Sequence, residues 1–165
     1  MKRIESIFKE LIPYVIILVC VILVKTFIFT PVIVNGSSMM NTLHENDVMI
    51  LNKIGLQFKD IKRFDIVVIQ TADSKIIKRV IALPGETIEY KDNKLYINDK
   101  YVQDSYGNGI TNDIEKKTLG KDEYYVLGDN RGDSLDSRIF GNVNKKDILG
   151  YTKYVIYPFN RIGSK

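Results

Sequence analysis

A long uncharged apolar stretch lies near the start of the chain. Residues 11–24 (LIPYVIILVCVILV) carry no charge, and the apolar character resumes after Lys25 as TFIFTPVIV. A helix needs roughly 20 apolar residues to cross a bilayer. A span of this length must include Lys25 near one end. A lysine there can keep its stem in lipid and its amine among the headgroups. The pattern predicts a transmembrane anchor over residues 11–30.

Charged residues beside this stretch predict its orientation. Lys2, Arg3 and Lys9 precede it, and positive flanks stay in the cytoplasm. We expect residues 1–10 to be cytoplasmic and residues 31–165 to lie outside, in a single-pass plasma-membrane protein. A cleavable signal peptide would also have basic and apolar regions, but no A-x-A-like site follows and the stretch is long, which favours an uncleaved anchor.

The remainder of the chain has the pattern of short β-strands. The segments are rich in Val, Ile and Tyr and are bounded by Gly, Asn or Asp, as in PVIVNG, DVMILNKI, FDIVVIQT, KIIKRVIAL, TIEYKD and KLYIND. The turn KDNK predicts a hairpin between residues 86–90 and 95–98. Residues 103–121 are polar and contain three glycines, which predicts a long loop or a poorly ordered flap. The predicted fold class is all-β and mostly antiparallel.

Composition excludes several kinds of function. The 24 basic and 20 acidic residues give a net charge of +4 and are interleaved, whereas a nucleic-acid partner would call for clustered basic residues. One cysteine, Cys20, and one histidine, His44, allow no disulfide and no ordinary zinc site. We therefore expect no nucleic acid, metal or cofactor.

Three polar clusters interrupt the strand pattern: GSSMMNTL, IKRVIALPGE and LGDNRGDSLDSRIFG. In the second, Lys78 and Arg79 stand in an apolar strand, so whichever face is buried takes one cation with it. Burial lowers the pKa of a lysine, and a neutral lysine can accept the proton of a serine hydroxyl. The alternative is a lysine whose stem packs while its amine reaches an acid at the rim.

Together the clusters resemble motifs of the bacterial type I signal peptidases, [SG]-x-S-M-x-P-T-L, K-R-x-x-G-L-P-G-D and G-D-N-R-x-x-S-x-D-S-R-x-x-G. The third motif is matched at Gly128, Asp129, Asn130, Arg131, Ser134, Asp136, Ser137, Arg138 and Gly141. The resemblance covers nearly the whole chain, including the apolar stretch. It implies an all-β catalytic core with a small second lobe, over roughly residues 87–125, as in the compact Gram-positive members.

The resemblance also implies roles for residues. Ser38 corresponds to the nucleophile and Lys78 to its general base. Ser134 corresponds to a hydroxyl that orients the lysine, and Asp136 and Arg138 to an ion pair near the site.

Other matched positions correspond to supporting residues. Arg79, Asp129 and Arg131 are expected to be structural. Met39 is a candidate wall of the substrate pocket or part of the core, as is Leu43.

Two positions depart from the family pattern. Gly36 stands where some members have a serine that assists the oxyanion hole, so backbone N–H groups must contribute more. Asn41 replaces the usual proline, which leaves φ less restricted. Ser37 fills a variable position, and His44 has no role in a serine–lysine dyad.

The implied activity is the removal of signal peptides from exported preproteins after A-x-A-like sites. The implied partners are those signal peptides, membrane lipid and the secretion translocon. Three alternatives remain: a catalytically silent, membrane-tethered binding module, a structural β protein, and the soluble self-cleaving repressors with a serine–lysine dyad, which the apolar stretch disfavours.

Overall fold

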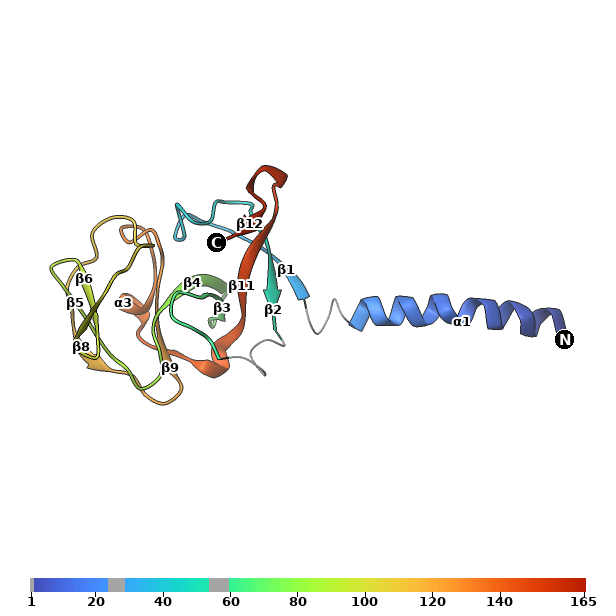
Figure 1. Ribbon diagram of the computed structural model, residues 1–165, viewed down its shortest axis with the longest axis horizontal. Helices are drawn as coiled ribbons and strands as arrows, with labels where there is room; N and C mark the ends of the chain where they lie inside the picture. Colours follow the sequence, from blue (N-terminus) through green and yellow to red (C-terminus); the bar gives the residue numbers. More distant parts are fainter. Residues whose placement is uncertain (1, 24–28, 54–59) are drawn as a thin grey trace.

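The computed structural model describes residues 2–23, 29–53 and 60–165. An N-terminal helix, α1 (Lys2–Leu23), extends away from a β domain (Figure 1). Among the described residues, no helix carries an apolar window long enough to cross a bilayer. The anchor predicted over residues 11–30 includes positions 24–28, which lie outside the described residues.

The main sheet of the β domain has eight antiparallel strands. Its order is β1-β2-β11-β3-β4-β9-β10, with β12 pairing to β11. The strands are β1 (Phe29–Ile33), β2 (Val48–Asn52), β3 (Ile66–Gln70), β4 (Lys75–Ala82), β9 (Glu123–Leu127), β10 (Val143–Asn144), β11 (Ile148–Tyr157) and β12 (Gly163–Ser164). The prediction of a mostly antiparallel β domain is confirmed.

A second, smaller sheet follows β4 in sequence and has the order β7-β6-β5-β8. Its strands are β5 (Thr87–Lys91), β6 (Lys94–Ile97), β7 (Lys100–Val102) and β8 (Ile114–Thr118). Asp92 and Asn93 both have positive φ, 51° and 61°, as a two-residue hairpin turn of type I′ requires. The predicted hairpin is therefore confirmed. The small sheet ends before β9, which belongs to the main sheet.

The prediction of a long loop over residues 103–121 holds for residues 103–113, which form no strand, and is wrong for the residues that follow. The segment contains β8, which pairs with β5, and Thr111 and Leu119 in it are buried. The sequence IEKKT of β8 has no clean apolar alternation, because most of its side chains face solvent. β8 is held in place by its pairing with β5, which is distant in sequence.

Two apolar clusters lie next to the polar motifs. One joins the two sheets and contains Ile81, Ala82, Ile88, Tyr90, Leu95, Ile97, Leu119, Tyr125 and Leu127. Another lies beneath the turn after β1 and contains Val34, Met39, Leu43, Met49, Ile66 and Val155. The remaining helical pieces of the described chain are short: α3 (Ser137–Phe140), η2 (Lys145–Asp147) and η3 (Phe159–Arg161).

Candidate active site

Ser38 lies in a tight turn that follows β1. The turn is closed by backbone hydrogen bonds from Met40 N to Ser37 O and from Leu43 N to Met39 O, at 3.0 and 2.9 Å. Met39 and Leu43 are buried beneath it. These two apolar anchors hold the turn even though Asn41 replaces the proline of the related motif.

The two adjacent serines have different partners. Lys78 Nζ donates to Ser38 Oγ at 2.7 Å. Ser37 Oγ instead donates to the carboxylate of Asp133, and its carbonyl accepts from Asn130 Nδ2 at 3.2 Å. Only Ser38 is therefore placed to exchange a proton with Lys78.

Lys78 reaches Ser38 from the middle of β4, where it pairs with Val67 of β3. Its side chain is almost fully buried. Burial lowers the pKa of Lys78 to about 8, against the opposing effect of the carboxylates of Asp136 and Asp129. About one molecule in ten then carries a neutral amine at pH 7, which is a usable base.

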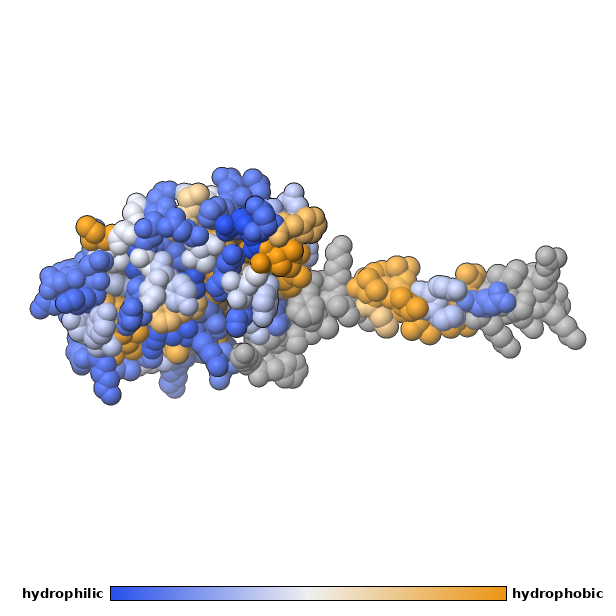
Figure 2. Space-filling view, turned by 45° about the horizontal axis from the view of Figure 1, so that its top comes forward, coloured by the Kyte–Doolittle hydropathy of each residue, from blue (hydrophilic) through white to orange (hydrophobic). Residues whose placement is uncertain are grey.

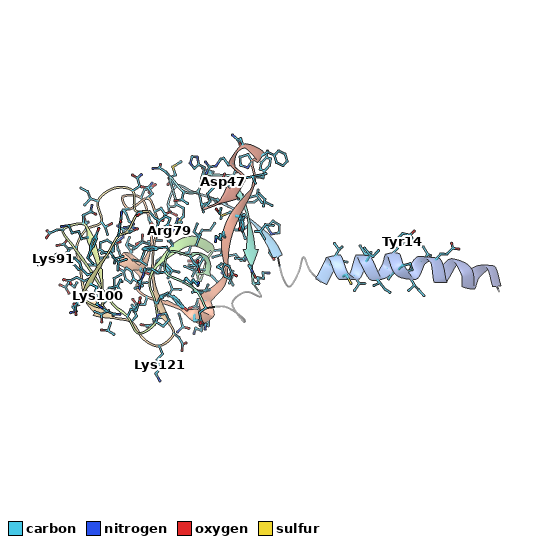
Figure 3. The ribbon with its side chains drawn as sticks, viewed as in Figure 1. Tyr14, Asp47, Arg79, Lys91, Lys100 and Lys121 are labelled. Carbon is cyan, nitrogen blue, oxygen red and sulfur yellow. The ribbon has the colours of Figure 1, made fainter. Side chains whose placement is uncertain are left out.

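Each face of β4 was expected to take one cation with it if buried, and both faces are buried, because Arg79 is buried as well as Lys78. Arg79 Nε and Nη2 donate to the two carboxylate oxygens of Asp129, at 2.8 and 2.6 Å. Alternation predicts one solvent face, but the small sheet and the loop after β9 cover the second face of β4. Figure 3 shows Arg79 within the β domain, whereas Lys91, Lys100 and Lys121 lie at its periphery.

Asp129 also connects β9 to the turn that carries Ser38. Thr42 Oγ1 donates to Asp129 Oδ2 at 2.5 Å, and Asn130 N donates to the Ser38 carbonyl at 3.0 Å. The buried Arg79–Asp129 pair therefore supports the turn from below. Sequence reasoning gave no role to Thr42 or Asn130, although both occupy fixed positions of the matched motifs.

Asp136 and Arg138 form the expected ion pair, with Arg138 Nε and Nη2 each 2.8 Å from a carboxylate oxygen of Asp136. Asp136 also accepts from Gly128 N at 3.0 Å. Burial by itself raises the pKa of Asp136, but these hydrogen bonds outweigh it and hold the pKa below its ordinary value. A permanent negative charge therefore lies close enough to oppose the fall in the Lys78 pKa.

Ser134 is the residue that the resemblance assigns to orienting Lys78, and the Lys78 amine is hydrogen-bonded to Ser38 Oγ. Ser134 Oγ is buried and has no hydrogen-bond partner of good geometry among the described residues. A Cβ on Gly128 would collide with both Ser134 Oγ and the Ser38 carbonyl oxygen. Glycine at 128 thus lets the Ser134 hydroxyl approach the Ser38 main chain.

A cleft of about 720 Å³ opens beside Ser38 and Lys78. Residues 31–36 line one side, and residues of β3, β4 and the turn between them line the other. Met39, the tentative pocket residue, contributes to the lining and also packs in the core. Gly36 lines the cleft with φ of +90°, a conformation that disfavours any side chain.

His44 is not hydrogen-bonded to Ser38. Its side chain is exposed, and its backbone N–H donates to Asp47 Oδ2 at 2.9 Å within the turn. The titratable side chain that contacts Ser38 Oγ is Lys78.

A β fold with a serine hydroxyl on a buried lysine, at the edge of an open cleft, is the arrangement of a serine–lysine hydrolase. The sequence profile described as signal peptidase, peptidase S26, matches residues 7–157. A signal peptidase I of Bacillus amyloliquefaciens is 38% identical over 160 residues, covering 90% of this chain and 86% of that protein.

Further relatives agree. Signal peptidase I V of Bacillus subtilis (strain 168) is 41% identical over 152 residues, 82% of this chain and 90% of that protein. The crystal structure of a signal peptidase I from Enterococcus faecalis V583 has a TM-score of 0.51 and 35% identity, covering 56% of this chain and 97% of that chain. The chain belongs to the signal peptidase I family of serine peptidases.

Proposed function

We propose that this chain is a membrane-anchored endopeptidase that removes signal peptides, with Ser38 as nucleophile and Lys78 as general base. The observation that carries the proposal is the 2.7 Å hydrogen bond between Lys78 Nζ and Ser38 Oγ at the edge of the cleft. The lowered pKa of this lysine, about 8, supports it, because an ordinary lysine is almost never neutral at pH 7.

The reaction begins with the fraction of molecules in which Lys78 is neutral. Its amine accepts the Ser38 proton, and Ser38 Oγ attacks the scissile carbonyl carbon. The Ser38 backbone N–H contributes to stabilising the tetrahedral oxyanion, and Gly36 adds no side-chain donor. Protonated Lys78 gives its proton to the leaving amine, and the neutral lysine then activates the water that hydrolyses the acyl-enzyme. Ser134 Oγ, buried beside the Gly128 and Ser38 main chains, is the proposed hydroxyl that orients the lysine.

The signal peptide binds in an extended form along the cleft. β1 is an edge strand of the main sheet, and its second half together with the residues that follow it, 31–36, lines one wall of the cleft. An edge can add main-chain hydrogen bonds to an extended peptide. Because the alanine side chains of an A-x-A site are small, they allow the peptide backbone to approach this wall closely.

Apolar surface supports a membrane location. The described side chains of α1 from Leu11 to Ile22 include ten exposed large apolar residues. Exposed apolar residues also lie on the β domain beside α1 (Figure 2). Two exposed apolar residues of the β domain, Ile33 and Tyr157, flank Val48 on neighbouring strands. We propose a single-pass anchor within residues 11–30, a cytoplasmic N-terminus, an extracytoplasmic catalytic domain in contact with plasma-membrane lipid, and encounters with the secretion translocon.

The test of function is cleavage of a preprotein whose signal ends in Ala-x-Ala, by the purified full chain in detergent. Mass spectrometry of the product should place the cut after the second alanine. Ser38→Ala should abolish it, and the matched variant Ser37→Ala should retain it, because Ser37 faces Asp133. A folded wild type that cleaves none of several such preproteins would instead favour a silent binding module.

Deleting residues 1–30 should reduce cleavage of preproteins in lipid vesicles far more than cleavage of short soluble peptides. The anchor confines enzyme and substrate to one interface and so raises their effective concentration, by factors that reach about 10²–10⁴ in linked systems. Rates on both substrates are compared for the full chain and the truncated chain. An equal loss of cleavage rate on the two substrates would contradict a role for the anchor in bringing enzyme and preprotein together.

A further inference from the structure

A segment of the small lobe lies directly against the loop that supports Ser38. We call residues 104–111 the strap and residues 128–131 the support loop. Asn108 N donates to Asp129 O at 2.7 Å, and Arg131 N donates to Asn108 O at 3.0 Å. The strap thus pairs with the support loop through its main chain, in a short parallel bridge.

The side chain of Arg131 fastens the same contact. Its guanidinium is buried and forms an ion pair with Asp104 of the strap. It also donates to Thr111 Oγ1 at 2.7 Å, to Tyr90 OH at 3.1 Å and to Gly128 O at 3.0 Å. Strap, small sheet and support loop therefore meet at one side chain.

The support loop continues this connection to the serine. Asn130, between Asp129 and Arg131, donates its backbone N–H to Ser38 O and its side-chain amide to Ser37 O. A shift of Arg131 would move Asn130, and with it the main chain from which Ser38 Oγ projects.

The strap also covers the second buried arginine. The Tyr106 ring lies 3.7 Å from Arg79 Cζ and 5.2 Å from the Phe64 ring. A cation over an aromatic face is stabilised most when it is desolvated. The strap therefore contacts both Arg131 of the support loop and Arg79, which pairs with Asp129 of that loop.

We propose that the strap positions Ser38 for catalysis, with Asp104 acting through Arg131 and Asn130 as a positioning residue. The inference rests on the proposed roles of Ser38 and Lys78. No strap residue lines the cleft beside the dyad. Loosening the strap should therefore lower kcat and leave KM for a short peptide nearly unchanged, because a contact that acts on the transition state alone affects kcat.

Two glycines provide a matched pair of steric variants. A Cβ on Gly107 would lie 2.6 Å from Arg131 Cζ, whereas a Cβ on Gly132 would meet nothing within 4 Å. Gly107→Ala should lower kcat about ten-fold or more, as expected for loss of roughly one well-made hydrogen bond to a charged group. Gly132→Ala should match the wild type. Equal kcat values for the two variants would overturn the proposal.

A charge variant tests the same contact if Gly107→Ala does not fold, as judged by circular dichroism. Asp104→Asn should lower kcat at unchanged KM, and Asp104→Glu should restore part of the rate. Asp99→Asn is the control, since Asp99 pairs with Lys116 on the exposed side of the small lobe. A normal kcat for Asp104→Asn would overturn the proposal. So would a loss of activity that is explained by unfolded protein or by a raised KM. A wild type without activity, or an active Ser38→Ala, would instead refute the proposed dyad.

Discussion

Replacing Lys78 with methionine should reduce signal-peptide cleavage by about 10³-fold or more, because a general base and its nucleophile act as a unit. Methionine keeps most of the side-chain volume but cannot accept the Ser38 proton. Lys121→Met is the matched control, since Lys121 is an exposed lysine at the periphery of the β domain (Figure 3). Preprotein cleavage by the two variants is compared at equal protein concentration. Cleavage retained by Lys78→Met would show that another group takes the proton.

The same substitution should also stabilise the fold at pH 7. The folded pKa of Lys78 is about 8, below the unfolded value of 10.5, so folding disfavours its charged form. This penalty is about 3 kcal/mol and is fully present below pH 8. It decreases as pH rises from 8 through the unfolded pKa of 10.5, above which the lysine is deprotonated in both states.

Urea unfolding of wild type and Lys78→Met at pH 7 and pH 10.5 measures this difference. We expect the variant to be more stable at pH 7 and the gain to shrink at pH 10.5. A gain that is the same at both pH values would point to packing rather than to the buried charge. Burial of the charged Lys78 amine would then not be what lowers the stability of the wild type.

Replacing Asp129 with alanine should have the largest effect on stability. The Arg79–Asp129 pair is almost completely buried, with side-chain exposures of 1% and 0%. Removal of one partner from such a pair costs about 3–5 kcal/mol, because the remaining charge is left without compensation. Loss of the Thr42 and Arg79 hydrogen bonds should also release the turn that carries Ser38, so cleavage should fall with stability.

Two comparisons separate this effect from loss of any ion pair. Asp99→Ala removes an exposed pair and should change urea stability little. The double variant Arg79→Met/Asp129→Leu should be less destabilised than Asp129→Ala alone, since it leaves no buried charge. A double variant as unstable as the single one would show that packing around the pair, not the unpaired charge, dominates.

Local patterns predicted the parts of this fold that depend on local physics. The turn KDNK predicted the hairpin, because Asp92 and Asn93 tolerate the positive φ that the turn needs. Short Val- and Ile-rich segments predicted β1 to β4, but not the two-residue strands β10 and β12. The pairing of Ser38 with Lys78 came from the resemblance, whereas the residues alone favoured a lysine whose stem packs while its amine reaches an acid at the rim.

Other features depend on contacts distant in sequence and were missed. Residues 103–121 were expected to be loose, since nothing in their composition shows that Asp104 meets Arg131. Burial of both cations of β4 was not predicted, since alternation cannot reveal that a second layer covers the other face.

The central claim, that Lys78 is the base for Ser38, is tested most directly by the pH dependence of kcat/KM on a short peptide substrate. The profile is measured from pH 6 to pH 10 for the wild type and for His44→Ala. The account predicts a limb that rises with an apparent pKa of about 8, as neutral Lys78 becomes available, and that is unchanged in His44→Ala. A limb near the ordinary imidazole pKa of about 6.5 that disappears in His44→Ala would contradict it.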